Sequence, residues 1–417
     1  MTQLVLRPGE QRRLVRGEDT VYAAQVQDIR GELVPGQAAD LLDAAGNFVG
    51  RGLVGGSSKA LLRLLTRSRE DIDRAFFERR LRRAVEYRRR LGETECCRLV
   101  FGDADGLPGL TVDKFGPVLS LQTLTAGMDQ RKELLCDLLE ELLHPDAIYE
   151  RNDVKVREKE GLAQQKGLLR GALPGELLVR ENGFLLKVDV AGGQKTGSYL
   201  DQRENHAALA PYVRGRRVLD VCCCTGGFGL HAAGYGAAHV TAVDVSAAAL
   251  REAQQNYARN GLFQADFVKA DMFDLLRGFE RQGRKFDVVV LDPPAFCKNK
   301  SALQKAFAGY REVNSRALRL LQSGGMLVTC SCSHYMTPDL FWEMLCLAAQ
   351  DAGVRLRLVE QRMQSRDHPV TPSRCISNAF SWRCCSLSRR RLGQGGRERR
   401  RASKRAPLGA LFEWGTG

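Results

Sequence analysis

The chain has 417 residues, of which 44% are hydrophobic, and it carries a formal net charge of +14. This length predicts two or three domains with packed cores, and the absence of any run of about 18 apolar residues argues against a membrane span. The first residues lack an apolar signal core, and the thirteen cysteines form no C-x-x-C pair. We therefore expect a cytoplasmic protein in a reducing compartment, without a metal site.

Two smaller domains are predicted in the first half of the chain. Residues 1–75 contain short strand-like segments separated by Gly, Pro and Asp turns about ten residues apart, which is typical of a small β-barrel. Residues 76–190 are expected to form a linker helix and a central α+β domain. The linker helix is indicated by apolar residues at helical spacing over 70–92, with arginines on the other face, and a second helix by leucines over 128–143.

Strands and helices alternate in the next domain, residues 191–370. Strands are predicted at 216–222, 239–246, 265–273, 285–294 and 326–332, and helices at 227–236, 248–261 and 311–325. Successive strand–helix units form a parallel, doubly wound sheet whose ligands bind at the carboxyl ends of the strands. The predicted fold class is therefore α/β, with a Rossmann-like domain preceded by the two smaller ones.

A glycine-rich turn follows the first of these strands. Asp220 lies near the strand end, and Gly226, Gly227 and Gly229 come before a helix. Glycines let a ligand approach the backbone closely, and the N-terminus of a helix offers unpaired N–H groups. Residues 227–232 also match the dinucleotide fingerprint G-x-G-x-x-A, although one such match is weak. An NAD site would look the same, and Asp220 alone is also explained as a helix cap.

Acidic residues follow the next three strands as well. Asp244 ends the second strand, where an acid can bind ribose hydroxyls, and Asp271 follows the third, where an acid suits the amine of an adenine. Asp292 follows the fourth strand, where a substrate base would meet the cofactor. This set, with no hydride-substrate domain after the sheet, is typical of S-adenosylmethionine-dependent methyltransferases rather than oxidoreductases.

The turn after the fourth strand is Asp292-Pro293-Pro294. Two prolines fix the backbone, so the Asp292 carboxylate is held in place and can bind a nucleobase by a ring nitrogen or an amine. Phe296 follows, and its ring could stack on a flipped base or belong to the core. Two thiols, Cys330 and Cys332, lie at the tip of the fifth strand. Spacing alone favours two small buried side chains.

Residues 1 to about 370 resemble the RlmI-type large-subunit ribosomal RNA cytosine-5 methyltransferases. The longest matching string is QKTGSYLDQR, Gln194–Arg203. The other matching segments are Leu4–Lys59, GDADGLPGLTVDKFG, AIYERNDVKVREKEGL, TGGFG, LDPPAF and SCSHYM. The resemblance implies an N-terminal PUA barrel that binds RNA, a central domain and a class I methyltransferase domain. It also implies S-adenosylmethionine as cofactor and 23S ribosomal RNA as partner, and a homodimer is one expected assembly.

The resemblance also implies roles for single residues. The family pattern S-C-S…M falls on Ser331–Ser333 and Met336, so Cys332 is the expected nucleophile, with Asp292 as its catalytic partner. Cys330 is expected to point away from the site and to be buried. The residues expected to bind the cofactor are Asp220, Thr225, Gly226, Gly227, Gly229, Asp244, Asp271 and Asp292. Those expected to bind the substrate are Lys195, Arg203, Pro293, Pro294 and Phe296.

The last part of the chain departs from the family. The family continues into an apolar strand that closes the sheet, whereas residues 371–417 hold eleven Lys and Arg against two Asp and Glu. We expect this segment to be a disordered, non-family tail, or alternatively a basic RNA-binding one. Residues 355–363 would then lack a neighbouring strand, and the catalytic domain would be less stable.

Two other functions stay open from the sequence. A methyltransferase acting on an amino group of adenine or guanine could also use a D-P-P turn with an aromatic residue, and it would need no thiol. A non-catalytic RNA-binding protein is the third reading, if the altered C-terminus disables the catalytic domain.

Overall fold

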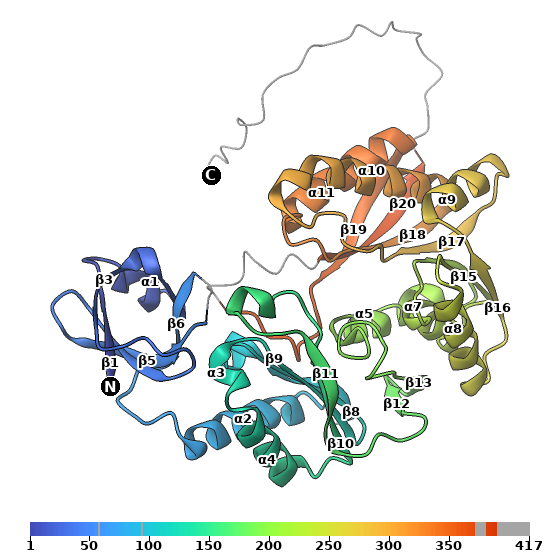
Figure 1. The fold of residues 1–417 in the computed structure, drawn as a ribbon. Coiled ribbons are helices and arrows are strands. Elements are labelled where there is room, and N and C mark those ends of the chain that lie inside the picture. The colour runs from blue at the N-terminus through green and yellow to red at the C-terminus, as the bar shows by residue number, and fades with distance from the viewer. Residues whose placement is uncertain (57–58, 93–94, 372–380, 390–417) are drawn as a thin grey trace, which may run out of the picture.

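The computed structural model describes residues 1–56, 59–92, 95–371 and 381–389. These residues form three successive β-sheets of six, five and seven strands and one separate two-stranded hairpin (Figure 1). In this described part of the chain, no helix is long and apolar enough to cross a membrane.

The N-terminal sheet consists of six short strands in the order β2-β6-β5-β4-β1-β3. They are β1 (Thr2–Leu6), β2 (Thr20–Tyr22), β3 (Val26–Arg30), β4 (Ala38–Leu42), β5 (Phe48–Val54) and β6 (Ala60–Thr66), with the short helix α1 (Gln11–Val15) after β1. Leu4, Leu6, Leu41 and Leu62 form its own buried core. This sheet is the predicted small β domain.

The central domain begins with helix α2 (Arg74–Arg90), which Asp73 caps by accepting the N–H of Phe76. The predicted apolar face of this helix, including Phe76 and Leu81, is buried. The sheet has the order β11-β10-β9-β8-β7. Its strands are β7 (Cys96–Phe101), β8 (Leu110–Phe115), β9 (Val118–Thr123), β10 (Ala147–Asn152) and β11 (Gln165–Gly171). The leucine-rich helix predicted at 128–143 is two helices, α3 (Ala126–Asp129) and α4 (Lys132–Leu143).

The hairpin of β12 (Leu178–Glu181) and β13 (Phe184–Lys187) precedes the predicted boundary at residue 190. The backbone N–H groups of Leu185 and Lys187 donate to the side chains of Asn260 and Asn256, at 2.9 and 3.0 Å. Both asparagines lie at the end of a helix of the third sheet's domain. The hairpin therefore packs against the third sheet's domain, while the N–H of Arg180 donates to Glu95 next to the central sheet at 2.8 Å, and the boundary at residue 190 stays a prediction.

The third sheet has the order β16-β15-β14-β17-β18-β20-β19. Its strands are β14 (Arg217–Val221), β15 (His239–Asp244), β16 (Ala265–Lys269), β17 (Phe286–Leu291), β18 (Leu321–Ser331), β19 (Val354–Arg362) and β20 (Ser381–Arg389). Helices α5 (Arg203–Ala207), α7 (Gly227–Gly234) and α8 (Ala247–Arg259) cover one face, and α9 (Met272–Arg281), α10 (Leu303–Leu320) and α11 (Pro338–Ala352) cover the other (Figure 1). The first five predicted strands pair in parallel, which confirms the doubly wound sheet.

Strand β20 corrects the prediction for the tail. Residues 381–389 are not disordered: they pair antiparallel with both β18 and β19 and lie between them. Cys384 and Cys385 are fully buried and Leu387 is 2% exposed, so this segment completes the core. Strand β19 is therefore paired with β20. The expected lower stability of the catalytic domain rested on an unpaired β19, and that reason no longer holds. The predicted disorder of 372–380 and 390–417 lies outside the described residues.

Candidate active site

The carboxyl ends of the parallel strands meet at a cavity of about 620 Å³. Its walls come from the segments that follow β14, β15, β16, β17 and β18 and from residues between Gln194 and Gln202. The predicted site residues in these walls are Lys195, Thr225, Gly227, Asp244, Asp271, Asp292, Pro293, Pro294 and Cys332. The fold thus brings together most of the predicted cofactor- and substrate-binding residues, which come from separate segments of the sequence.

The turn from β14 to α7 has an unusual backbone. Cys222, Cys224 and Gly226 have φ of 63°, 49° and 95°, a region that residues with a Cβ seldom occupy. A Cβ on Gly227 would stand 2.6 Å from Cε1 of His206, and one on Gly229 would stand 2.5 Å from Oη of Tyr257. Neither position accommodates a side chain, so the turn passes close to its neighbours. Thr225 and Gly227, at the N-terminus of α7, line the cavity.

Asp220 stabilises this turn through a hydrogen bond to its backbone. Its side chain is fully buried, and its Oδ2 accepts the backbone N–H of Gly229 at 2.8 Å. Burial raises the pKa of Asp220 to about 7, against an ordinary value of 3.8. Asp220 does not line the cavity, and neither do Gly226 and Gly229. The structure therefore favours the helix-cap alternative for Asp220 over direct contact with a ligand.

Asp244 and Asp271 lie at the ends of adjacent strands on the cavity wall. Asp244 accepts the N–H groups of Cys224 at 2.9 Å and of Ser246 at 2.8 Å, one on each oxygen. Asp271 caps α9 through Oδ1, which accepts the N–H groups of Phe273 and Asp274. Its Oδ2 is left for a ligand. Both carboxylates are oriented by backbone N–H donors and can accept further hydrogen bonds from hydroxyl or amine groups.

Asp292 is held on the opposite wall. Its Oδ2 accepts a hydrogen bond of 3.0 Å from Nε2 of Gln202. Burial raises the pKa of Asp292 to about 6, and the negative charge of Asp201 adds to this effect. A carboxyl with this pKa is partly protonated near neutral pH, so it can act as a hydrogen-bond donor as well as an acceptor.

The two thiols differ in their surroundings as predicted. Cys330 is fully buried, whereas Cys332 is exposed at the cavity and its Sγ lies 3.9 Å from the carbonyl oxygen of Pro293. Withdrawal of the Cys332 thiol from bulk water, together with the charges of Asp292 and Asp201, raises its pKa to about 11. The cation of Lys195 acts in the opposite direction.

Lys195 reaches the cavity but is already paired. Its Nζ lies 2.8 Å from both carboxylate oxygens of Asp201 and 4.3 Å from the ring centroid of Tyr199. Burial alone would raise the pKa of Asp201, but the charges of Lys195 and His368 prevail and lower it to about 2. This ion pair holds the ammonium group at the cavity that the Cys332 thiol also lines.

Two predicted substrate-binding residues lie away from the cavity. Arg203 is buried, with Nη2 3.7 Å from the carboxylate of Asp367. Phe296 is partly buried in the core, with its ring centroid 4.5 Å from that of Tyr310. The structure favours a role in the core for Phe296 over stacking on a base. Arg203 is buried among protein groups rather than at the cavity. Their predicted contacts with substrate have no support in this geometry.

Sequence reasoning missed Tyr199, Gln202, Glu181 and His206, all of which line the cavity. Tyr199 and Gln202 lie inside the matched string Gln194–Arg203, so the resemblance could have nominated them. Glu181 on the hairpin contacts His206 on α5, at 2.6 Å between Oε1 and Nδ1, and no spacing in the sequence signals this contact.

Two family models match the chain. A PUA-like domain model matches residues 4–67, and a model of S-adenosylmethionine-dependent methyltransferases matches residues 169–377, half of the chain. The fold class predicted from the sequence is thereby confirmed. With this fold and this cavity, the protein is an S-adenosylmethionine-dependent methyltransferase, and S-adenosylmethionine is its cofactor.

Curated relatives cover nearly all of the chain. Ribosomal RNA large subunit methyltransferase I of Klebsiella pneumoniae (strain 342) is 44% identical over 375 residues, which are 88% of this chain and 94% of the relative. The proteins of the same name from Cronobacter sakazakii and Shewanella amazonensis are each 43% identical, over 89% and 88% of this chain and 96% and 95% of the relatives. The chain belongs to the ribosomal RNA large subunit methyltransferase I family.

Solved structures share the fold of most of the chain. A putative S-adenosylmethionine-dependent methyltransferase from Streptococcus mutans covers 93% of this chain at a TM-score of 0.77 and 19% identity. A putative methyltransferase complexed with SAH covers 93% at a TM-score of 0.78 and 20% identity. In both comparisons the whole of the other chain is covered, so the order and arrangement of the three domains are shared.

Proposed function

We propose that this enzyme methylates carbon 5 of a cytosine in 23S ribosomal RNA and that Cys332 is its nucleophile. The carrying observation is the exposed Cys332 thiol, 3.9 Å from the Pro293 carbonyl oxygen of the turn that holds Asp292. A thiol and a carboxyl that follow adjacent strands and line one cavity suit covalent catalysis on a pyrimidine ring. The names of the curated relatives support ribosomal RNA of the large subunit as the substrate.

The residues on the other wall fit S-adenosylmethionine. The oriented carboxylates of Asp244 and Asp271 suit ribose hydroxyls and an adenine amine, in that order along the sheet. Gly227, the first residue of α7, lines the cavity and brings the N-terminus of this helix to the cofactor. Thr225 lines the same wall. When bound, the cofactor supplies the methyl group.

Carbon 5 of cytosine is a poor nucleophile, and the thiolate of Cys332 overcomes this. Its Sγ forms a bond to carbon 6, and the ring electrons move to give an enamine that is nucleophilic at carbon 5. After carbon 5 has gained its methyl group, a base removes the carbon-5 proton. The electron pair of that C–H bond restores the ring double bond, and the bond between Sγ and carbon 6 breaks to return the thiolate.

Asp292 assists this attack by holding the base. A protonated Asp292 donates a hydrogen bond to ring nitrogen 3, which draws electrons from carbon 6. With a pKa of about 6, about a tenth of the Asp292 carboxyls are protonated at pH 7. The cation of Lys195 lowers the pKa of Cys332, but the pKa of about 11 already includes this effect and leaves little of the thiol ionised at neutral pH. The reaction therefore draws on a small thiolate fraction.

The target base must leave its stack to reach this cavity, at a cost of a few kcal/mol. The PUA-like domain and the arginine-rich helix α2 are the elements we assign to the RNA contacts that offset this cost. A homodimer and a cytoplasmic location stay predictions from the sequence.

Amino-group methylation is the main competing function, because the Asp292 turn would serve it as well. The third candidate function was a non-catalytic RNA-binding protein with a disabled catalytic domain. Its reason was a missing strand, and β20 fills that place in the sheet. Nucleoside mass spectrometry of 23S ribosomal RNA, treated with the enzyme and isotopically labelled S-adenosylmethionine, distinguishes the first two. We expect labelled 5-methylcytidine, and labelled N-methyladenosine or N-methylguanosine in its place would refute the proposal.

A further inference from the structure

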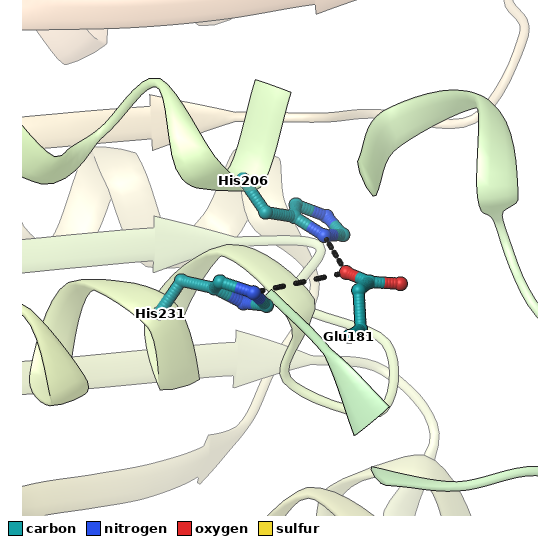
Figure 2. A group of neighbouring side chains, drawn as sticks. All are labelled: Glu181, His206 and His231. Carbon is teal, nitrogen blue, oxygen red and sulfur yellow. Dashed lines mark hydrogen bonds and ion pairs between the residues drawn. The ribbon is translucent and has the colours of Figure 1, made fainter. Parts of the chain in front are cut away.

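A buried group of metal-ligating side chains lies beside the cofactor wall. Glu181 at the end of β12, His206 on α5 and His231 on α7 point toward one another (Figure 2). They are 2%, 7% and 0% exposed. We infer that these three residues form a binding site for a divalent transition-metal ion of the zinc type. The expectation of no metal, drawn from cysteine spacing, did not consider ligands that only the fold assembles.

The ligand atoms have suitable identities and spacing. Each residue offers one atom, Oε1 of Glu181, Nδ1 of His206 and Nε2 of His231, and all lie within 4.8 Å of one another. Oε1 is 2.6 Å from Nδ1 and 3.8 Å from Nε2. A zinc ion with bonds of about 2.0–2.1 Å keeps tetrahedral ligand atoms about 3.4 Å apart, so small side-chain shifts suffice. Two imidazoles and a carboxylate are a set that zinc uses with one position left open.

The orientation of His231 is that of a metal ligand. Its Nδ1–H donates to the carbonyl oxygen of Gly227 at 2.8 Å, which turns the lone pair of Nε2 toward Glu181. Metal-binding histidines generally have their other ring nitrogen fixed in this way. Nδ2 of Asn182 now lies 3.1 Å from Nε2, and the ion would replace this contact while Asn182 keeps its 2.8 Å bond to the carbonyl of Arg203.

The same contacts allow a competing arrangement without metal. The proton between Nδ1 of His206 and Oε1 of Glu181 already satisfies both atoms, and it must be released when an ion binds. A bound ion would differ from this hydrogen bond in its structural effect, because its three ligands come from three separate elements, β12, α5 and α7. An ion would join these elements directly under Gly227, and so would stabilise the N-terminus of α7 that faces the cofactor.

Cobalt(II) is the probe for the test, because its visible spectrum reports its ligands. The full chain is stripped with EDTA, dialysed and titrated with Co²⁺ at constant pH, and with Zn²⁺ by calorimetry. We expect one saturable equivalent with weak visible bands and no intense thiolate charge-transfer absorption in the near ultraviolet. Glu181→Gln and His231→Gln should each weaken binding at least about tenfold. His239→Asn is the matched control, since His239 is partly exposed and pairs with Asp266 away from the cluster.

Several outcomes would overturn the inference. These are the lack of saturable binding, equal affinity in both ligand variants, or a strong thiolate band that places the ion on cysteines. Circular dichroism and thermal melting check that each variant folds. Anomalous scattering from wild-type crystals grown with Co²⁺ locates the ion without any variant: a peak between the three side chains supports the site, and a peak only elsewhere refutes it. None of these readouts depends on RNA methylation, so failure here leaves the proposed function untouched.

Discussion

Gln202 donates a hydrogen bond from Nε2 to Oδ2 of Asp292 at 3.0 Å, and its own Oε1 accepts from Nδ2 of Asn205. This chain of amide groups connects α5 to the turn that holds the target base in our proposal. The bond favours the charged form of Asp292 and so keeps its pKa lower than burial alone would set it.

Replacing Gln202 should change the pH dependence of kcat/KM. The thiolate fraction of Cys332 rises with pH, while the protonated fraction of Asp292 falls above its pKa. Activity should therefore rise with pH up to a break near pH 6 and then level off. Gln202→Leu removes a bond that lowers the pKa of Asp292, so the break should move to higher pH. Gln255→Leu, at an exposed glutamine on α8, should leave it in place. A break that does not move in Gln202→Leu would show that Asp292 does not act as a proton donor.

Asp244→Ala should weaken S-adenosylmethionine binding by about tenfold or more. The substitution removes an oriented carboxylate from the cavity wall and also the bonds to Cys224 and Ser246 that shape it. Losing one charge-assisted hydrogen bond costs roughly 1.5–3 kcal/mol. Titration calorimetry measures this directly. Asp266→Ala, at an exposed carboxylate on the next strand, is the control, and equal affinity in both variants would remove Asp244 from the site.

Asp220 should make the enzyme less stable as pH rises. Its folded pKa of about 7 lies above the ordinary 3.8, so its contribution is fully present below about pH 3.8 and is lost as pH rises through about 7. Asp220→Asn keeps an acceptor for Gly229 but cannot ionise. The variant should gain stability relative to wild type between pH 4 and 8, on the order of a few kcal/mol. Denaturant unfolding at several pH values measures this, with Asp274→Asn as an exposed control. A difference independent of pH would contradict the account.

Two truncations should separate β20 from the rest of the tail. A chain ending after residue 371 loses β20, which exposes the edges of β18 and β19 and removes the buried Leu387, Cys384 and Cys385. Burying one Leu contributes roughly 1.5–3 kcal/mol, so this chain should melt well below the full chain or aggregate. A chain ending after residue 389 keeps the strand and should melt like the full chain. Equal melting of both truncations would mean that β20 adds nothing to the fold.

Local patterns were sufficient to predict the central strands and the loops that carry the site. Alternating apolar strands and amphipathic helices indicate a doubly wound sheet, and that topology alone gathers Asp244, Asp271 and Asp292 at one edge. Cys330 is buried as expected, but strand alternation is not the reason, because side chains i and i+2 share one face of a strand. Cys332 differs because β18 ends at Ser331 and residue 332 lies beyond the strand. These inferences depend on neighbours in sequence or on a rule of topology.

What the sequence did not reveal depends on contacts between distant segments. The composition of 371–417 suggests a solvated tail, yet residues 381–389 pair with both β18 and β19 and bury their cysteines. Phe296 and Arg203 have the residue types of RNA-binding groups, and only packing shows them in the core. The contact of Glu181 with His206 joins a hairpin to a helix, and neither segment has a pattern that anticipates it.

The most direct test of the proposal is a covalent trap on RNA that carries 5-fluorocytosine at the target position. Fluorine cannot leave carbon 5 as a proton does, so the bond between Sγ and carbon 6 should persist once the methyl group has been added. We expect a protein–RNA adduct on a denaturing gel with the wild-type enzyme and with Cys330→Ala, and none with Cys332→Ala. An adduct that survives in Cys332→Ala, or full methylation by that variant, would contradict the assignment of Cys332 as the nucleophile.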